Sequence, residues 1–404
     1  MKTIFEGLRV LDITNLFAGP YASVYMADMG AEVIHIERPK VGDDMRSYTP
    51  KLDGDMKTPC VSFLVGNRGK KSLCIDLGDP MAKEILYKLI PTCDVVIENY
   101  RPGVLDKLGF GYEDCRKLRE DIIYCSISAY GRGGPYSNKG GYDPITQAIS
   151  GMMDTTGEVD GLPQKNRSSL ADFIGGYVAY AEVATALYHR LKTGEGNFID
   201  VSLTDCYINC NCFVEQVDAG VPQEDMTRCG AHEPRIAPWG HYAGPNGDRI
   251  MICAVNPTVW AKLCNAMGRP DMISDDPRFS NAVLRGINKE ALIEIIESWL
   301  QTFPNTAAAL EHMDRFGVPA SKIYNSTDVA NDPHFLARGS VAPIHVSRDM
   351  GDRTFRGRGP IFRFSNGETL NGIPPYLGEH NAELMKSVGL ADDVIDELNK
   401  KWLP

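Results

Sequence analysis

Residues 8–37 read LRVLDITNLFAGPYASVYMADMGAEVIHIE. The apolar run at 8–13 predicts a buried strand, and the Gly19-Pro20 turn after it predicts the start of a helix that runs to Met29. Residues 32–37 then predict a second strand. A strand, a helix and a strand in this order favour two parallel strands joined by a covering helix. We therefore expect this segment to begin an open α/β sheet.

The same rhythm continues through the first two hundred residues. Further strands are predicted at 71–77, 93–99, 122–127 and 197–202, with helices at 80–89 and 112–120 between them. Residues 168–192 predict a long, largely apolar helix. After Asp218 the residue composition changes. A strand at 249–255 and helices at 257–267 and 289–303 then predict a smaller unit. The expected fold class is therefore α/β, with an open, mostly parallel Rossmann-like sheet in a large domain and a smaller α/β domain.

Composition restricts the classes of function. A chain of 404 residues with a formal net charge of -11 is expected to form two units and not to bind nucleic acid through a broad basic surface. No run of eighteen apolar residues predicts a membrane span, and no signal peptide is recognisable, so a cytoplasmic protein is expected. The eleven cysteines lack paired spacing. They are interpreted as reduced, and the group Cys206, Cys210 and Cys212 as core packing and not a metal site.

The loops after the predicted strands carry basic residues. The loop before the first helix has only one glycine, so a dinucleotide is not expected there. Arg38 follows the second predicted strand, Arg68, Lys70 and Lys71 lie around the third, and Arg101 and Lys107 follow the fourth. Because ligands of open α/β sheets collect at the carboxyl ends of strands, this placement favours a site for a phosphate-bearing anion. Solvated surface lysines are the alternative.

Asp172 is an acid within an otherwise apolar stretch that begins the long helix. One interpretation is an N-cap, because aspartate accepts hydrogen bonds from free amides at a helix start. The other is a reactive carboxylate, since Gly175 and Gly176 remove side chains beside it and let a bulky substrate approach. Asp143 is likewise an N-cap candidate and only secondarily a candidate acid. No GxSxG, HExxH or Walker A motif is present.

Nine short segments, in order, resemble one known family, the class III CoA-transferases, which include formyl-CoA and crotonobetainyl-CoA transferases. The resemblance covers essentially the whole chain. The segments are GLRVLD (7–12), GP (19–20), GAEVI (30–34) with ERP (37–39), NRGKKS (67–72), ENYRPG (98–103), GGYD (140–143), LAD (170–172), KTGEG (192–196) and LGEH (377–380).

The resemblance implies roles for individual residues. Asp172 matches the family's nucleophile, which favours catalysis over the N-cap. The positions that it implies for coenzyme A binding are Arg38, Lys70, Asn99, Tyr100, Lys107 and Lys139. The positions expected around the reacting acids are Phe17, Tyr142, Asp143, His232, Arg235 and Trp239, with His241 nearby.

The resemblance also implies an architecture and a reaction. Family members are interlocked homodimers, so we expect residues 1–218 and 329–404 to build the large domain and residues 219–328 the small one. The implied partners are an acyl-CoA and a carboxylic acid, which exchange coenzyme A through an aspartyl anhydride and an aspartyl-CoA thioester. Coenzyme A is then a substrate, and no permanently bound cofactor or metal is expected.

Two departures from formyl-CoA transferases argue against oxalate or formate as substrates. Phe17 stands where those relatives carry a glutamine, and residues 233–247 do not reproduce their glycine-rich flap. An α-methylacyl-CoA racemase is a rival function, but racemases place a histidine base where this chain has Tyr142, and tyrosine is a poor substitute. A catalytically silent acyl-CoA binding protein is a second rival, and the retention of Asp172 argues against it.

Overall fold

The computed structural model describes residues 3–55, 58–346 and 352–404. The chain forms two compact units. The first unit comprises Met1–Met152, Asn166–Asn211 and Ala330–Pro404, and the second comprises Met153–Lys165 and Cys212–Val329. The chain therefore passes twice from the first unit into the second, the first time for a short excursion only.

A six-stranded sheet forms the centre of the first unit. All of its paired strands are parallel, in the order β3-β2-β1-β4-β5-β6. This arrangement confirms the predicted open Rossmann-like α/β sheet. The strands are β1 (Arg9–Ile13), β2 (Glu32–Glu37), β3 (Lys71–Cys74), β4 (Val95–Glu98), β5 (Ile123–Ser128) and β6 (Asn197–Ser202).

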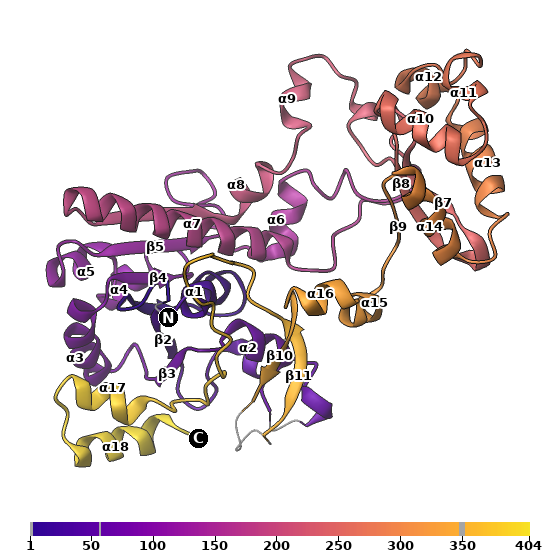
Figure 1. Ribbon diagram of the computed structural model, residues 1–404. Coiled ribbons are helices and arrows are strands. Elements are labelled where there is room, and N and C mark those ends of the chain that lie inside the picture. Colours follow the sequence, from indigo (N-terminus) through magenta and orange to yellow (C-terminus); the bar gives the residue numbers. More distant parts are fainter. Residues whose placement is uncertain (1–2, 56–57, 347–351) are drawn as a thin grey trace. The chain divides into compact units, whose positions relative to one another are not determined.

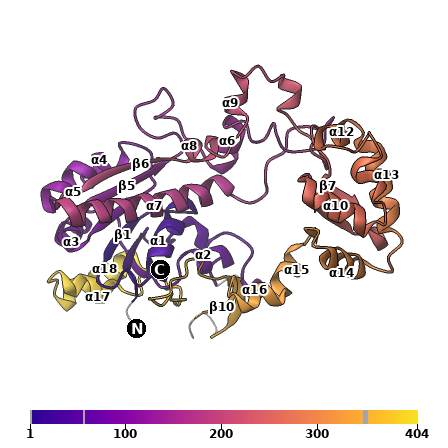
Figure 2. The ribbon, with the colours of Figure 1, turned by 45° about the horizontal axis from the view of Figure 1, so that its top comes forward.

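Helices cover both faces of this sheet, because successive side chains of a buried strand point to opposite faces. Leu11 and Ile13 of β1 belong to a core that includes residues of α3 (Pro80–Leu89), α17 (Asn381–Ser387) and α18 (Asp392–Trp402). Val10 belongs to a second core, with residues of α1 (Ala18–Asp28) and α7 (Leu170–Thr193). Figures 1 and 2 show α7 running along the sheet beside α1.

The two glycines that follow Asp172 pack against protein rather than facing a substrate. A Cβ added at Gly176 would lie 2.9 Å from the carbonyl oxygen of Ala18, and one at Gly175 would lie 2.2 Å from a methyl carbon of Leu203. Both glycines are buried. The interpretation that they open a path for substrate was therefore wrong: they allow α1 and α8 (Leu203–Ile208) to approach α7 closely.

Shorter elements complete the first unit. The C-terminal segment contributes an antiparallel pair, β10 (Val341–His345) and β11 (Thr354–Arg358). The remaining helices are α2 (Val61–Gly66), α4 (Val104–Leu108), α5 (Tyr112–Leu118), α6 (Asp143–Ile149) and α16 (Pro333–Ala337).

The second unit has an antiparallel sheet of its own, in the order β7-β8-β9. Helices α10, α13 and α14 contribute Trp260, Ile296 and Met313 to its buried core. The elements are β7 (Trp239–Ala243), β8 (Arg249–Cys253), β9 (Ala320–Lys322), α9 (Val214–Val217), α10 (Pro257–Ala266), α11 (Asp271–Ser274), α12 (Ala282–Ile287), α13 (Lys289–Leu300) and α14 (Thr306–Phe316). The chain returns to the first unit within α15 (Ser326–Asn331). Over the ranges that the structure describes, no helix has the length and apolar character needed to cross a bilayer.

Candidate active site

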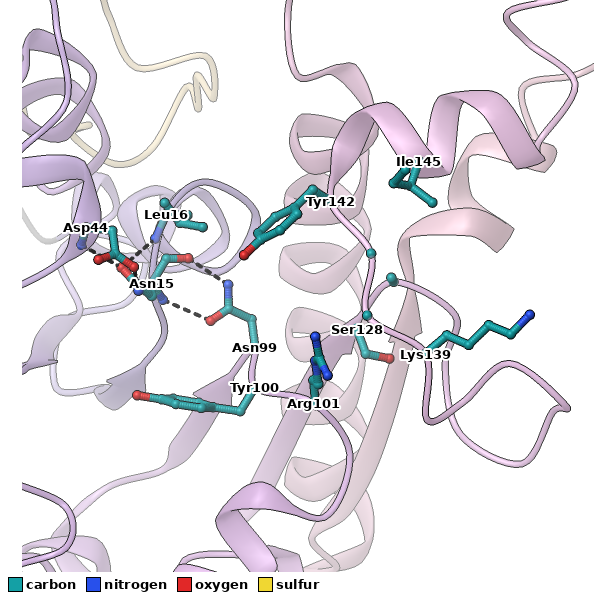
Figure 3. A pocket seen from close by; sticks show the side chains of 13 residues that line it. Asn15, Leu16, Asp44, Asn99, Tyr100, Arg101, Ser128, Lys139, Tyr142 and Ile145 are labelled. Atoms are coloured by element: carbon teal, nitrogen blue, oxygen red, sulfur yellow. Dashed lines mark hydrogen bonds between the residues drawn. The ribbon is translucent and has the colours of Figure 1, made fainter.

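The strand order of the large sheet reverses between β1 and β4, and the loops that leave these strands face each other across that point. The backbone N–H of Asn15 donates to Asn99 Oδ1 at 2.9 Å, and Asn99 Nδ2 donates back to the Asn15 carbonyl at 2.7 Å. Figure 3 shows this reciprocal pair, with the Tyr142 ring directed toward it. Ligands of open α/β sheets bind in the crevice at such a reversal.

A polar cavity of about 460 Å³ opens at this point. Asn99, Tyr100 and Lys139, three of the positions expected to bind coenzyme A, line it, and Arg101 adds a second cation. The full lining comprises Asn15, Leu16, Asp44, Asn99, Tyr100, Arg101, Ser128, Ala129, Lys139, Gly140, Gly141, Tyr142 and Ile145.

A second cavity of about 330 Å³, called here the acid cavity, contains Asp172. Phe17, Tyr142 and Asp143 line it as well, as expected from the sequence. The rest of its lining comprises Leu16, Ala18, Tyr48, Asn99, Ile127, Ser128, Ala129, Gly141, Pro144, Ser169 and Leu203. The two cavities adjoin, because both are lined by Leu16, Asn99, Ser128, Ala129, Gly141 and Tyr142.

Asp172 lies in the first turn of α7 but does not cap it. The N-cap is Ser169, so the N-cap interpretation of Asp172 was wrong. Within residues 3–55, 58–346 and 352–404, no group forms a hydrogen bond with its carboxyl. Burial and, after it, the negative charge of Asp143 raise the pKa of Asp172 to about 7. A carboxylate of this kind is more basic, and so more nucleophilic, than an ordinary one.

Asp143 fulfils the capping role from a neighbouring helix. It is the first residue of α6 and is 5% exposed. Its Oδ1 accepts from the backbone N–H of Ala171 at 2.8 Å, near the start of α7, and its Oδ2 accepts from Gln147 Nε2 at 2.6 Å. These two hydrogen bonds hold the Asp143 carboxyl in place close to Asp172. Nothing in the sequence indicated that it would cap α7 instead of its own helix.

Leu16 forms part of the wall shared by both cavities and has an unusual backbone. Its φ is 68°, in the left-handed region that side chains other than those of Gly, Asn and Asp rarely adopt. Its N–H donates to Asn15 Oδ1 at 3.0 Å and lies 3.3 Å from Asp43 Oδ1. These two hydrogen bonds stabilise the strained turn at Leu16, a residue that lines both cavities.

Beneath that turn lies a buried cluster of charged groups. Lys70 Nζ donates to Asp12 Oδ2 at 3.0 Å, to the Pro20 carbonyl at 3.0 Å and to Asn67 Oδ1 at 2.8 Å. The Lys70 side chain is 0% exposed. Its ammonium thus faces the interior of the unit, not the polar cavity, although the sequence suggested a cation at the phosphates. The signal for this was Asp12 within an apolar strand, since a buried acid requires a counter-charge.

His35 joins the same cluster. Its Nδ1 lies 3.1 Å from Asp12 Oδ2, and its Nε2 lies 3.5 Å from Asp43 Oδ2. Burial alone would lower the pKa of His35, but the charge of Asp12 raises it to about 9. Burial alone would raise the pKa of Asp12, but the charges of Lys70 and His35 hold it well below its ordinary value.

The other expected residues line neither cavity. Arg38 forms an ion pair with Asp44, which lines the polar cavity, and Lys107 is exposed on α4. His232, Arg235 and Trp239 belong to the second unit. There the His232 ring packs 4.9 Å from Tyr242, and Arg235 lies 3.6 Å from Glu233. Among the described residues, no group of three His, Cys, Asp or Glu side chains is arranged to hold a metal ion.

Comparison with known proteins identifies the family. A model of CoA-transferase family III matches residues 5–381. The chain belongs to CoA-transferase family III. This transferase is 35% identical to the mouse (Mus musculus) succinyl-CoA:glutarate CoA-transferase, over 95% of this chain and 86% of that protein. It is 32% identical to the succinyl-CoA–D-citramalate CoA-transferase of Chloroflexus aurantiacus, over 98% of this chain and 97% of that protein.

The fold of the transferase agrees with this assignment. A crystal structure of a CaiB/BaiF family protein from Brucella suis superimposes with a TM-score of 0.83 at 32% identity, and it covers 96% of this chain and 100% of that one. The transferase therefore acts on coenzyme A thioesters, as its family does, and the two adjoining cavities are the candidate place for that reaction.

Proposed function

We propose that Asp172 exchanges coenzyme A between an acyl-CoA and a carboxylic acid. An Asp172 carboxylate oxygen attacks the thioester carbonyl, the C–S bond breaks, and a mixed anhydride and the coenzyme A thiolate result. The thiolate then attacks the aspartyl carbonyl of the anhydride, which releases the donor acid and leaves an aspartyl-CoA thioester. The acceptor carboxylate reverses both steps. Each bond that forms replaces one that breaks, so the exchange balances without a further reactant.

The single observation that carries this proposal is a carboxyl in a cavity with no hydrogen-bond partner among the described residues and with a pKa raised to about 7. The attack removes the negative charge from Asp172. Burial and the charge of Asp143 both disfavour that charge. The protein therefore destabilises the reactant carboxylate relative to its neutral ester-like intermediates.

The adjoining polar cavity is proposed to hold the coenzyme A part of the substrate. Its cations Arg101 and Lys139 suit phosphates, and Asn99 and Tyr100 suit the adenine and pantetheine parts. Arg38 and Lys107 are proposed as further phosphate contacts, both with exposed side chains. Lys70 is proposed to act only through the buried cluster that supports the Leu16 turn.

Succinyl-CoA and a short dicarboxylic acid are proposed as the reacting pair, in agreement with the named relatives. The fifteen residues that line the acid cavity include no Lys or Arg. A second carboxylate would therefore be met by hydroxyl donors, of which Tyr48, Tyr142 and Ser169 are available. His232, Arg235 and Trp239 are proposed to join this pocket in an interlocked homodimer, which light scattering of the purified protein would test.

The decisive experiment is to trap the intermediate. Incubation with succinyl-CoA and hydroxylamine should convert Asp172 to a hydroxamate, which peptide mass spectrometry locates. Asp172→Ala should abolish both the adduct and acid exchange but retain coenzyme A binding. Asp205→Asn, an exposed acid on α8, is the matched control. Exchange that survives in Asp172→Ala would refute the mechanism, and deuterium incorporation beside the thioester without acid exchange would indicate the racemase.

A further inference from the structure

Gln147 is a buried amide that lines neither cavity, yet it contacts the segment that carries the nucleophile. It lies in α6 and is 1% exposed. Its Oε1 accepts from the backbone N–H of Asn166 at 2.8 Å. Its Nε2 donates to Asp143 Oδ2 at 2.6 Å and lies 3.3 Å from the Asn166 carbonyl and 3.4 Å from the Ser168 carbonyl.

These contacts lie where the chain returns to the first unit. The excursion into the second unit ends at Lys165, and Asn166 is the first residue of the returning segment. The Ser168 carbonyl also accepts from the Leu170 N–H at 2.8 Å, and α7 begins there. A segment this short, bonded at Asn166 and at Ala171, leaves the backbone at Asp172 little freedom. Gln147 therefore helps to fix the position of the Asp172 carboxyl.

The surroundings of Gln147 require an amide in one orientation. The three groups around Nε2 are all acceptors, whereas the group at Oε1 is a donor. A carboxylate at this position would bring a charged oxygen against Asp143 Oδ2, and a hydrocarbon would leave both partners unsatisfied. Glutamine supplies one donor and one acceptor at the required spacing without adding a charge.

We infer that Gln147 is a positioning residue for the transfer reaction: it aligns the Asp143 carboxylate and fixes the backbone that carries Asp172 into the acid cavity. It is not a catalytic residue, because it does not line either cavity. The inference rests on the proposed role of Asp172 as the nucleophile.

A pH profile can report on the Asp143–Gln147 pair. Asp172 comes from α7, and Tyr207 comes from α8, which packs on α6. Burial and, to a smaller extent, the charge of Asp143 raise the pKa of Tyr207, so Tyr207 stays neutral over the pH range of the test. Arg167 lies in the returning segment and is exposed.

The test replaces the donor with a group that donates only when protonated. Gln147→Glu can share one proton with Asp143, which restores the hydrogen bond at low pH. From about pH 6 to pH 9, the rate of adduct formation on Asp172 relative to wild type should therefore fall by about tenfold. Gln147→Met, of similar volume, should lose about as much at every pH, whereas coenzyme A binding stays unchanged in both variants.

A swap of the two side chains gives a second, independent variant. In Asp143→Asn combined with Gln147→Glu, the new amide at 143 can donate to the new carboxylate at 147 and still accept from Ala171. This double variant should recover part of the rate that Gln147→Glu loses at high pH. Gln301→Glu is the matched control, because Gln301 Nε2 also donates to two backbone carbonyls, at 3.2 and 2.9 Å, but lies in the second unit.

Thermal unfolding at each pH shows whether the variants remain folded, and rates are compared for folded protein only. A Gln147→Glu profile parallel to wild type, or a swap variant no faster than Gln147→Glu at high pH, would overturn the inference. The proposed function fails differently, because wild-type protein would then give no adduct on Asp172 at any pH.

Discussion

Two carboxylates of the first unit, Asp12 and Asp172, are both enclosed but have opposite surroundings. Asp12 accepts hydrogen bonds from Thr14, Ser23 and Lys70, and its pKa lies well below the ordinary value. Asp172 has no partner among the described residues, and its pKa is raised to about 7. Burial therefore does not by itself distinguish a structural acid from a reactive one. The difference lies in whether the fold supplies counter-charges and donors.

Removing the counter-charge of Asp12 should have the largest effect on stability. Lys70→Met removes the lysine cation from the buried Asp12 carboxylate and leaves only His35 to balance its charge, which should lower the free energy of unfolding by roughly 3 kcal/mol. Lys71→Met is the matched control, because Lys71 pairs with Glu32 and Glu383 at the surface, and it should cost at most about 1 kcal/mol. Urea unfolding measures both. Equal losses in the two variants would contradict the assignment of Asp12 to a structural role.

Removing the charge of Asp172 should change stability in the opposite direction. Its raised pKa favours folding while the group is protonated, and this contribution is lost as the pH rises from about 4 through about 7. At pH 8, Asp172→Asn should therefore be more stable than wild type by roughly 1–3 kcal/mol while transfer is lost. Asp12→Asn should be less stable than wild type. Scanning calorimetry at several pH values tests the signs.

A smaller effect is expected in the pH dependence of the rate. The nucleophile must be ionised, so kcat/KM should rise with pH with a midpoint near the Asp172 pKa of about 7. Asp143→Asn removes the second cause of that elevation and should move the midpoint to lower pH. Initial rates measured over a range of pH at saturating acceptor acid give this midpoint. A midpoint that Asp143→Asn leaves in place would show that Asp143 acts only as a helix cap.

The smallest effect is expected at the edge of the polar cavity. Arg101→Gln and Lys139→Gln should each weaken coenzyme A binding by roughly three- to tenfold, because exposed cations contribute modestly to anion affinity. Both losses should shrink as salt is added. Calorimetric titration with coenzyme A at two ionic strengths checks this expectation. Asp172→Asn, in contrast, should bind coenzyme A as wild type does.

The sequence predicts the parallel sheet well because strand and helix periods are local signals. The predicted second strand at 32–37 coincides with β2 (Glu32–Glu37), and the long helix predicted at 168–192 is α7 within two residues at each end. Asp172, Tyr142 and Phe17, which the sequence analysis singled out, line one cavity. These successes depend on segments whose neighbours in space are also predictable from strand order.

What sequence could not provide are pairings between segments far apart in the chain. Lys70 and Asp12 are separated by 58 positions, and only the register of β1 with its neighbours brings them together. The link from Gln147 to Asn166 spans 19 positions across an excursion into the other unit. A glutamine in such a short helix gives no sign of this role, because three of its four hydrogen-bond partners are backbone groups.

The left-handed turn at Leu16 has a consequence for engineering. Glycine adopts a φ of 68° at far lower cost than leucine, so shortening this side chain would relieve backbone strain at the place where both cavities would gain room. Most changes that widen a binding site weaken the protein around it. Here the substitution that would admit bulkier acyl chains loses the contact of Leu16 with a hydrophobic cluster but removes an unfavourable torsion, which makes Leu16 a suitable first position for broadening the range of acids accepted.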